Sequence, residues 1–266
     1  MAVSEQSGDA TDQATSQRRT VVFLHGIGTK SGMWHDHIRD LPEFDCLAPD
    51  LPGHGTATTR PWTSLKDAAA EVTRLIESTP AGKADLVGLS LGGAVGIELM
   101  NTRPELVGRV LIDGVSAVPW RPAPLMLAAV ALVSPFIHTR PVRWAIAKAL
   151  SVQKPRRTGF YAELDLVSGR TIRRAIRDAI SVRLRRIDFP GPVLLVAGQH
   201  DVAAARVSDA TLAAELPNAE ARYLPRAWHA WAGTDPNLHR AMVSAFLRDE
   251  PLPNRLLPET AKPRTR

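Results

Sequence analysis

A serine lies between two glycines at the end of an apolar run, in the order Gly88-Leu89-Ser90-Leu91-Gly92. A serine at a sharp turn from a strand into a helix has a strained backbone, and side chains two residues before and after it would collide. Glycine removes those side chains, and the turn exposes the hydroxyl at the carboxyl edge of a sheet. Ser90 is therefore the candidate nucleophile, and the amide of Leu91 is predicted to face a developing oxyanion. The five-residue pattern by itself also fits a glycine-rich turn with an incidental serine.

A serine hydroxyl becomes a good nucleophile only beside a base, which a third group must orient. Asp201 follows the apolar run 193–197, and His229 follows the short run 221–224. Because loops after parallel strands meet at one edge of a sheet, both side chains are predicted to lie near Ser90. Asp113, at the end of the run 109–114, is an alternative acid, but Asp201 is better placed.

The elements that must position these residues alternate along the chain. Short β-branched or apolar runs are separated by helical patterns, which predicts an α/β fold with a mostly parallel sheet of about six strands and helices on both faces. Between residues 115 and 188 the alternation stops, and prolines and helical patterns indicate an inserted helical cap. The expected division is a disordered polar tail at 1–19, a core at 20–114 and 189–250, the cap at 115–188 and a polar tail at 251–266.

The amino-acid composition is that of a globular protein and limits the classes to which this protein can belong. With 266 residues, 44% of them hydrophobic, the chain can fill a sizeable core. The single cysteine, Cys46, cannot form an internal disulfide, which indicates a reducing, cytoplasmic compartment. The longest apolar run, 125–133, is too short to span a membrane.

The charge is unevenly distributed. The whole chain carries +6, but the segment 120–186 has 14 basic and three acidic side chains and carries +11, which leaves −5 for the rest. One interpretation is attraction of an anionic substrate or an acidic lipid surface. The other is that arginines simply solvate exposed helix faces. Nucleic acid is not a predicted partner, because no recognised motif or aromatic platform accompanies the charge.

Other motifs predict neither a cofactor nor a metal. The loop 28–31 lacks the glycine that a P-loop needs before its lysine, and the dinucleotide fingerprint also fails there. His35-Asp36-His37 has no third or fourth ligand in a metal-binding pattern, so it is interpreted as a solvated helix face. His200, beside Asp201, is interpreted as incidental.

Five motifs together resemble the α/β-hydrolase fold serine hydrolases of the esterase and lipase type. They are His25-Gly26, the loop 50–55, the serine turn, Gly198-x-x-Asp201 and His229 before the last helix. The resemblance covers residues 21–247 apart from the cap, and the chain order serine, aspartate, histidine is the one found in that fold. It implies Ser90 as nucleophile, His229 as base, Asp201 as orienting acid, and the amides of Ile27 and Leu91 as oxyanion donors.

His25 and His54 are interpreted as residues that stabilise their loops. Two departures concern the shape of the pocket: Trp228 stands where many members have glycine, and no proline occurs between 202 and 207.

The expected substrate is a small carboxylic ester, thioester or lactone with a hydrophobic portion. Trp228, Trp231, Phe136 and Trp144 are candidate pocket residues, because two flank His229 and two belong to the apolar part of the cap. Alternatives are carbon–carbon bond hydrolysis or perhydrolysis on the same fold, and a non-catalytic small-molecule binding protein. The oligomeric state is not predicted.

Overall fold

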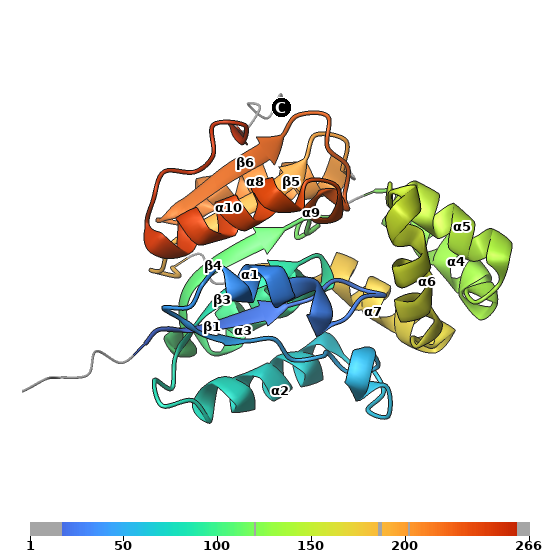
Figure 1. The fold of residues 1–266 in the computed structure, drawn as a ribbon, viewed down its shortest axis with the longest axis horizontal. Coiled ribbons are helices and arrows are strands. Elements are labelled where there is room, and N and C mark those ends of the chain that lie inside the picture. The colour runs from blue at the N-terminus through green and yellow to red at the C-terminus, as the bar shows by residue number, and fades with distance from the viewer. Residues whose placement is uncertain (1–17, 120, 186–187, 202, 260–266) are drawn as a thin grey trace, which may run out of the picture.

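The computed structural model describes residues 18–119, 121–185, 188–201 and 203–259. They form a seven-stranded sheet in the order β2-β1-β3-β4-β5-β6-β7 (Figure 1). The first six strands pair in parallel and β7 is antiparallel to β6. The strands are β1 (Thr20–Leu24), β2 (Asp45–Leu47), β3 (Ala84–Leu89), β4 (Val107–Asp113), β5 (Val193–Gly198), β6 (Ala219–Leu224) and β7 (Leu257–Pro258). The predicted α/β class and mostly parallel sheet are confirmed.

The seventh strand is a difference from the predicted sheet of about six. Leu257 and Pro258 pair with Tyr223 and Arg222 at the edge of the sheet, within the segment predicted as a polar tail. Two residues carry no periodic signal, and proline is tolerated only at such an edge. Of the predicted tails, residues 1–17 and 260–266 lie outside the described part of the chain.

Helices cover both faces of the sheet (Figure 1). Along β1, Val22 and Leu24 face one core cluster while Val21 and Phe23 face the other, as the alternation of a strand requires. The first cluster contains side chains of α2, α3 and α8, and the second contains those of η1, α9 and α10. The core helices are η1 (Ser31–Trp34), α1 (His35–Arg39), η2 (Gly55–Ala57), α2 (Leu65–Glu77), α3 (Leu91–Thr102), η3 (Pro104–Leu106), α8 (Ala203–Glu215), α9 (Trp231–Thr234) and α10 (Pro236–Arg248).

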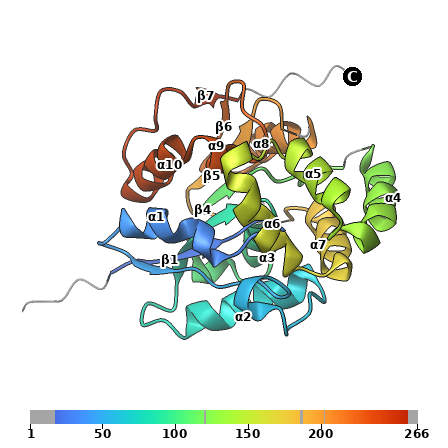
Figure 2. The same ribbon diagram turned by 45° about the vertical axis from the view of Figure 1, so that its right-hand side comes forward.

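The inserted segment between β4 and β5 is helical and lies to one side of the sheet (Figure 1). Within it, α4 lies at the outer edge and α7 lies between α4 and the sheet (Figure 2). The Trp62 indole donates a hydrogen bond of 2.9 Å to Asp178 of α7, which ties the segment to the core. Its helices are α4 (Ala123–Val133), η4 (Ser134–Phe136), α5 (Arg140–Ala149), η5 (Lys154–Arg156), α6 (Arg157–Asp165) and α7 (Gly169–Ser181).

Within the described ranges, no helix combines the length and apolar character that crossing a bilayer requires.

Candidate active site

Ser90 forms the turn between β3 and α3. Its backbone has φ 52° and ψ −107°, which a residue with a side chain rarely adopts. The turn is held because the Ser90 amide donates a 2.7 Å hydrogen bond to the carbonyl of Asp113, at the end of the neighbouring strand β4. A hydrogen bond to the neighbouring strand therefore stabilises the strained turn.

The neighbouring glycines are required by close backbone contacts. A Cβ atom on Gly88 would lie 2.6 Å from the backbone of Gly92 and Gly93, closer than real Cβ contacts allow. One on Gly92 would overlap the carbonyl oxygen of Leu24 in β1. One on Gly93 would lie 2.6 Å from Val115. Glycine at these positions lets α3 start directly against the strands, which leaves the Ser90 side chain at the sheet edge.

Ser90, His229 and Asp201 are brought together from three separate parts of the chain. His229 Nε2 lies 3.1 Å from Ser90 Oγ, and His229 Nδ1 lies 2.9 Å and 3.0 Å from the two oxygens of Asp201. A carboxylate only accepts hydrogen bonds, so Nδ1 carries the proton and Nε2 offers its lone pair to the serine hydroxyl. The Asp201 side chain is fully buried, whereas that of His229 is partly exposed. This arrangement can transfer the serine proton to the imidazole.

The surroundings set the protonation of His229. Burial lowers the pKa of His229. The charge of Asp201, the hydrogen bond to Asp201 and the charge of Asp113 raise this pKa, and together they outweigh the effect of burial. The net pKa of His229 therefore lies above the ordinary histidine value. The base that activates a serine nucleophile needs a carboxylate that orients the imidazole and stabilises the imidazolium.

The loop after β1 carries the second predicted oxyanion donor, Ile27. Leu51 donates its amide to His25 Nε2 at 2.9 Å, so the protonated Nδ1 donates to the carbonyl of Gly26 at 2.8 Å. Burial, followed by the charge of His54, lowers the pKa of His25 to about 4, which keeps it neutral. His25 thereby links this loop to the loop at 50–55.

Among the described residues, neither the Ile27 amide nor the Leu91 amide has an acceptor. Leu91 is the first residue of α3, where helical amides lack intrahelical partners and the helix dipole favours negative charge.

Asp113, the alternative acid, makes no hydrogen bond to His229. Its Oδ1 accepts a 3.0 Å hydrogen bond from the indole of Trp231, and its Oδ2 lies 3.3 Å from Nε2 of His239. Trp231 follows His229 by two residues and is fully buried. Asp113 therefore holds the turn that carries the histidine, while Asp201 contacts the histidine itself.

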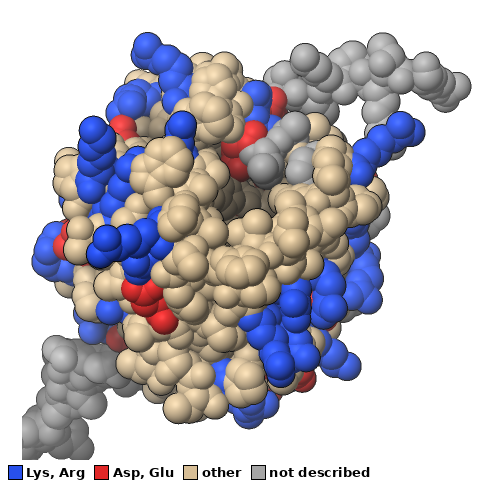
Figure 3. Space-filling model, turned by 90° about the vertical axis from the view of Figure 1, so that its right-hand side faces the viewer, with Lys and Arg blue, Asp and Glu red and all other residues tan. Residues whose placement is uncertain are grey.

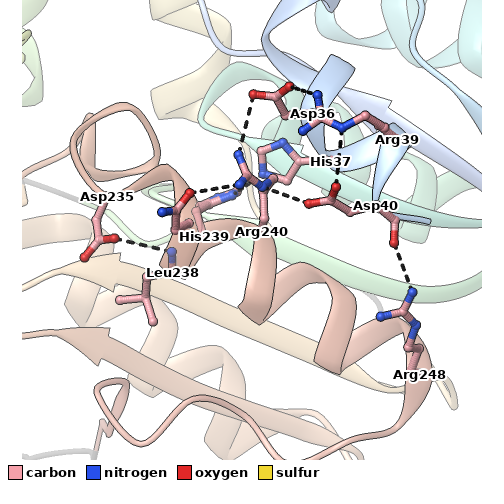
Figure 4. Close-up of polar contacts among 10 residues, drawn as sticks. Asp36, His37, Arg39, Asp40, Asp235, Leu238, His239, Arg240 and Arg248 are labelled. Atoms are coloured by element: carbon pink, nitrogen blue, oxygen red, sulfur yellow. Dashed lines mark hydrogen bonds and ion pairs between the residues drawn. The ribbon is translucent and has the colours of Figure 1, made fainter.

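A buried histidine pair extends this network between α1 and α10 (Figure 4). His37 Nε2 and His239 Nδ1 are hydrogen-bonded at 2.8 Å, and both side chains are buried. Burial, followed by the charges of His239 and Arg240, lowers the pKa of His37 to about 3. The interpretation of 35–37 as a solvated helix face is thus wrong for His37, although Asp36 is exposed and pairs with Arg39.

Sequence reasoning did not find His239 or a third buried acid near the site, Asp209. Burial, and then repulsion from Asp113 and Asp201, raises the pKa of Asp209 well above the ordinary value and favours its neutral form. Both lie inside helices, α10 and α8, where a polar residue at an inward position gives no distinct sequence signal. Within the described residues, no group of three or more His, Cys, Asp or Glu side chains could hold a metal ion.

The four candidate pocket residues lie in different surroundings. Trp231 belongs to the core, packed beside His239. Trp228 is half-exposed and its ring lies 5.2 Å from that of His200. Phe136 and Trp144 are also about half-exposed, on the inserted segment. The structure thus keeps Trp228 next to His229 at the surface but does not bring the other three to the Ser90 hydroxyl through any described contact.

The inserted segment reaches the loop of Ile27. Ile27 packs against a cluster formed by Ile137, Leu164, Val167 and Ile172. Gly28 also lies close to the inserted segment, because a Cβ added to it would be 3.2 Å from the Leu164 side chain. On the other side, Gln153 donates a long hydrogen bond of 3.4 Å to the carbonyl of Thr234, which follows the turn of His229.

Two curated relatives share parts of the sequence. Lipase LipV of Mycobacterium tuberculosis is 37% identical over 95 residues, which are 35% of this chain and 36% of the lipase. The 2-succinyl-6-hydroxy-2,4-cyclohexadiene-1-carboxylate synthase of Serratia proteamaculans is 30% identical over 103 residues, which are 38% of this chain and 40% of the synthase. The chain thus matches about two fifths or less of the length of each.

The fold is similar to that of a thermophilic esterase from Thermogutta terrifontis, with a TM-score of 0.73 and 17% identity over 87% of this chain and 90% of the esterase. A sequence model described as the alpha/beta hydrolase family matches residues 21–243. That range holds the predicted nucleophile turn, Asp201, His229 and the loop of Ile27. The protein therefore belongs to the alpha/beta hydrolase family.

Proposed function

We propose that this protein is a serine hydrolase that cleaves a carboxylic ester through an acyl-enzyme on Ser90. The observation that carries the proposal is the chain of contacts from Ser90 Oγ to His229 Nε2 at 3.1 Å and from His229 Nδ1 to Asp201 at 2.9 Å. The relatives named as a lipase and an esterase support the ester as substrate class. A thioester or lactone presents the same acyl carbon to the nucleophile.

In the first half of the proposed reaction, Ser90 Oγ attacks the carbonyl carbon and its proton passes to His229 Nε2. The carbonyl oxygen gains a negative charge, which the amides of Ile27 and Leu91 receive. Each such donor typically contributes about 3 kcal/mol to transition-state stabilisation. The imidazolium then protonates the leaving alcohol as the ester bond breaks, which leaves the acyl group on Ser90.

In the second half, His229 takes a proton from water while the water oxygen attacks the acyl carbon. The same two amides hold the oxyanion. Collapse of this intermediate breaks the bond to Oγ, the imidazolium returns its proton to Ser90, and the carboxylic acid leaves. All groups that these steps use are side chains and amides of the chain or water.

We propose that residues 115–188 act as a cap over the core formed by 20–114 and 189–250. The contacts of this segment with Ile27 on one side and Thr234 on the other support that role. The apolar cluster behind Ile27 favours a substrate with a hydrophobic portion. The single cysteine, which is free, suits the proposed cytoplasmic location.

The second candidate is chemistry at a bond other than an ester, such as carbon–carbon bond hydrolysis or perhydrolysis. The relative named as a synthase favours including it, because that protein carries a different activity on a similar sequence.

The test is covalent labelling with a fluorophosphonate, followed by intact mass measurement. Ser78, at the exposed end of α2, provides the matched control, since its hydroxyl donates to the backbone carbonyl of Leu75. We expect one adduct on the parent and on Ser78→Ala, and none on Ser90→Ala. An adduct on Ser90→Ala contradicts the proposal, because another residue is then the reactive nucleophile. No adduct on well-folded parent also contradicts it and favours a non-catalytic binding protein. A panel of esters, thioesters, lactones and carbon–carbon substrates then separates the two candidates.

A further inference from the structure

Helix α4 is apolar on every side, yet none of its residues is buried. Met126 and Val130 are half-buried on the side toward the molecule, whereas Leu125 and Leu132 are 77% and 74% exposed. A helix that is hydrophobic all round normally lies in a protein core or in contact with lipid. Here its outer side faces solvent.

The exposed apolar surface continues beyond α4. Val133, the last residue of α4, is 39% exposed, and Phe136 and Trp144, which lie outside that helix, are 56% and 51% exposed. Together with Leu125 and Leu132 these residues are called the apolar face below. No charged residue occurs from Pro122 to Ile137. Exposed apolar side chains gathered on one segment mark an interaction site, since soluble monomers rarely expose large apolar patches otherwise.

The charges around the apolar face are mostly basic, although Asp165 of α6 pairs with Arg143 and His138. No Asp or Glu occurs between Asp113 and Glu163, while seven Lys and Arg residues do. Arg121 precedes α4 and Arg140 begins α5, so they flank the apolar stretch at its two ends; both are exposed, and neither forms an ion pair with a described acidic residue. Figure 3, which faces the inserted segment, shows neutral surface across the middle, with many basic and a few acidic side chains at its margins.

This charge pattern decides between the possible occupants. In a symmetric dimer the same surface meets itself, so the basic margins of two copies would face each other and repel. An anionic lipid surface offers hydrocarbon to the leucines and aromatic rings and phosphates to the arginines.

We propose that the apolar face docks on membranes that contain anionic lipid, with the outer side of α4 lying in the interface. Leu125 and Leu132 enter the boundary between headgroups and acyl chains, and Arg121 and Arg140 remain at the level of the phosphates. The proposal goes beyond the reaction proposed above and does not depend on Ser90, so docking is measured by binding alone.

The first experiment measures co-sedimentation with vesicles of phosphatidylcholine, with and without phosphatidylglycerol. The test variant is Leu125→Gln with Leu132→Gln; glutamine preserves helix propensity, and both positions are exposed, so the fold is expected to persist and circular dichroism checks it. The matched control is Val207→Gln on α8, where the valine is 57% exposed. We expect parent and control to bind the anionic vesicles, and the double variant to bind at least about tenfold more weakly.

The second experiment tests the charges. Arg121→Gln with Arg140→Gln should weaken binding to anionic vesicles by about fivefold per charge, and added salt should weaken the parent in the same direction. The proposal is overturned if the parent does not bind anionic vesicles or if the leucine variant binds as well as the parent. It is also overturned if the parent forms a dimer that the leucine variant dissociates while neither binds lipid. Ser90→Ala should bind like the parent, which separates docking from catalysis.

Discussion

Two buried aspartates near His229 allow a matched test of which one orients it. Both oxygens of Asp201 lie within 3.0 Å of His229 Nδ1, whereas Asp113 contacts Trp231 and His239 instead. Replacing each by asparagine removes one charge and almost no volume. The two variants therefore differ in the contact that is lost, and only Asp201→Asn changes a direct contact of His229.

Asp201→Asn should greatly reduce the rate. The asparagine amide can donate to Nδ1, which stabilises the tautomer with the proton on Nε2, and that tautomer cannot accept the proton of Ser90. The corresponding change in a serine protease lowers kcat about 10⁴-fold. We expect kcat/KM to fall by about 10³ to 10⁴, equivalent to roughly 4 to 5.5 kcal/mol of transition-state stabilisation.

Asp113→Asn should instead shift the pH dependence. Its oxygen can still accept from the Trp231 indole, so kcat/KM at the plateau should stay within about threefold of the parent. In the parent, the raised pKa of His229 means that activity falls as the pH decreases through a value above about 6.5. Because the charge of Asp113 contributes to that rise, its removal lowers the pKa of His229 and moves the acidic limb to lower pH.

The assay is hydrolysis of a chromogenic short-chain ester from about pH 5 to 9, with folding checked by circular dichroism. The reasoning is refuted if Asp201→Asn keeps more than about a tenth of kcat/KM. It is equally refuted if Asp113→Asn causes the larger loss, because Asp113 would then be the orienting acid.

Two further changes test the support of the site. Gly92→Ala should prevent folding or destabilise the folded protein by several kcal/mol, because the methyl group overlaps the backbone of β1. The control is Gly233→Ala, whose methyl group meets no atom within 4 Å and should leave the melting temperature nearly unchanged. Equal melting temperatures of the two variants would contradict the steric argument. Trp231→Phe leaves Asp113 without its indole donor, so we expect a loss of about 2 kcal/mol in unfolding free energy and a fall in kcat larger than the change in KM, since the turn of His229 loses its anchor. Unchanged kcat in this variant would show that the anchor does not position the histidine.

The part of this protein that the sequence determined is mainly local. The glycine spacing around Ser90 follows from sterics within a few residues, and the structure places those glycines against backbone atoms as the pattern requires. The alternation of apolar runs and helical patterns was sufficient to predict the α/β class and the interruption between β4 and β5. Ser64 likewise caps α2, because its side chain accepts from the amide of Asp67 three residues later. Each of these features depends on neighbours in the chain.

Tertiary structure decided what depends on pairing between distant residues. Ser90 and His229 are 139 residues apart, and their distance follows from the order of strands in the sheet. The choice of Asp201 over Asp113 as the partner of His229 depends on the same order, because Asp113 ends β4 and Asp201 lies just after β5, at the same edge of the sheet. Packing between elements buries Trp231 and His37 and pairs β7 with β6. The hydrophobic periodicity of a single element carries no information about such packing.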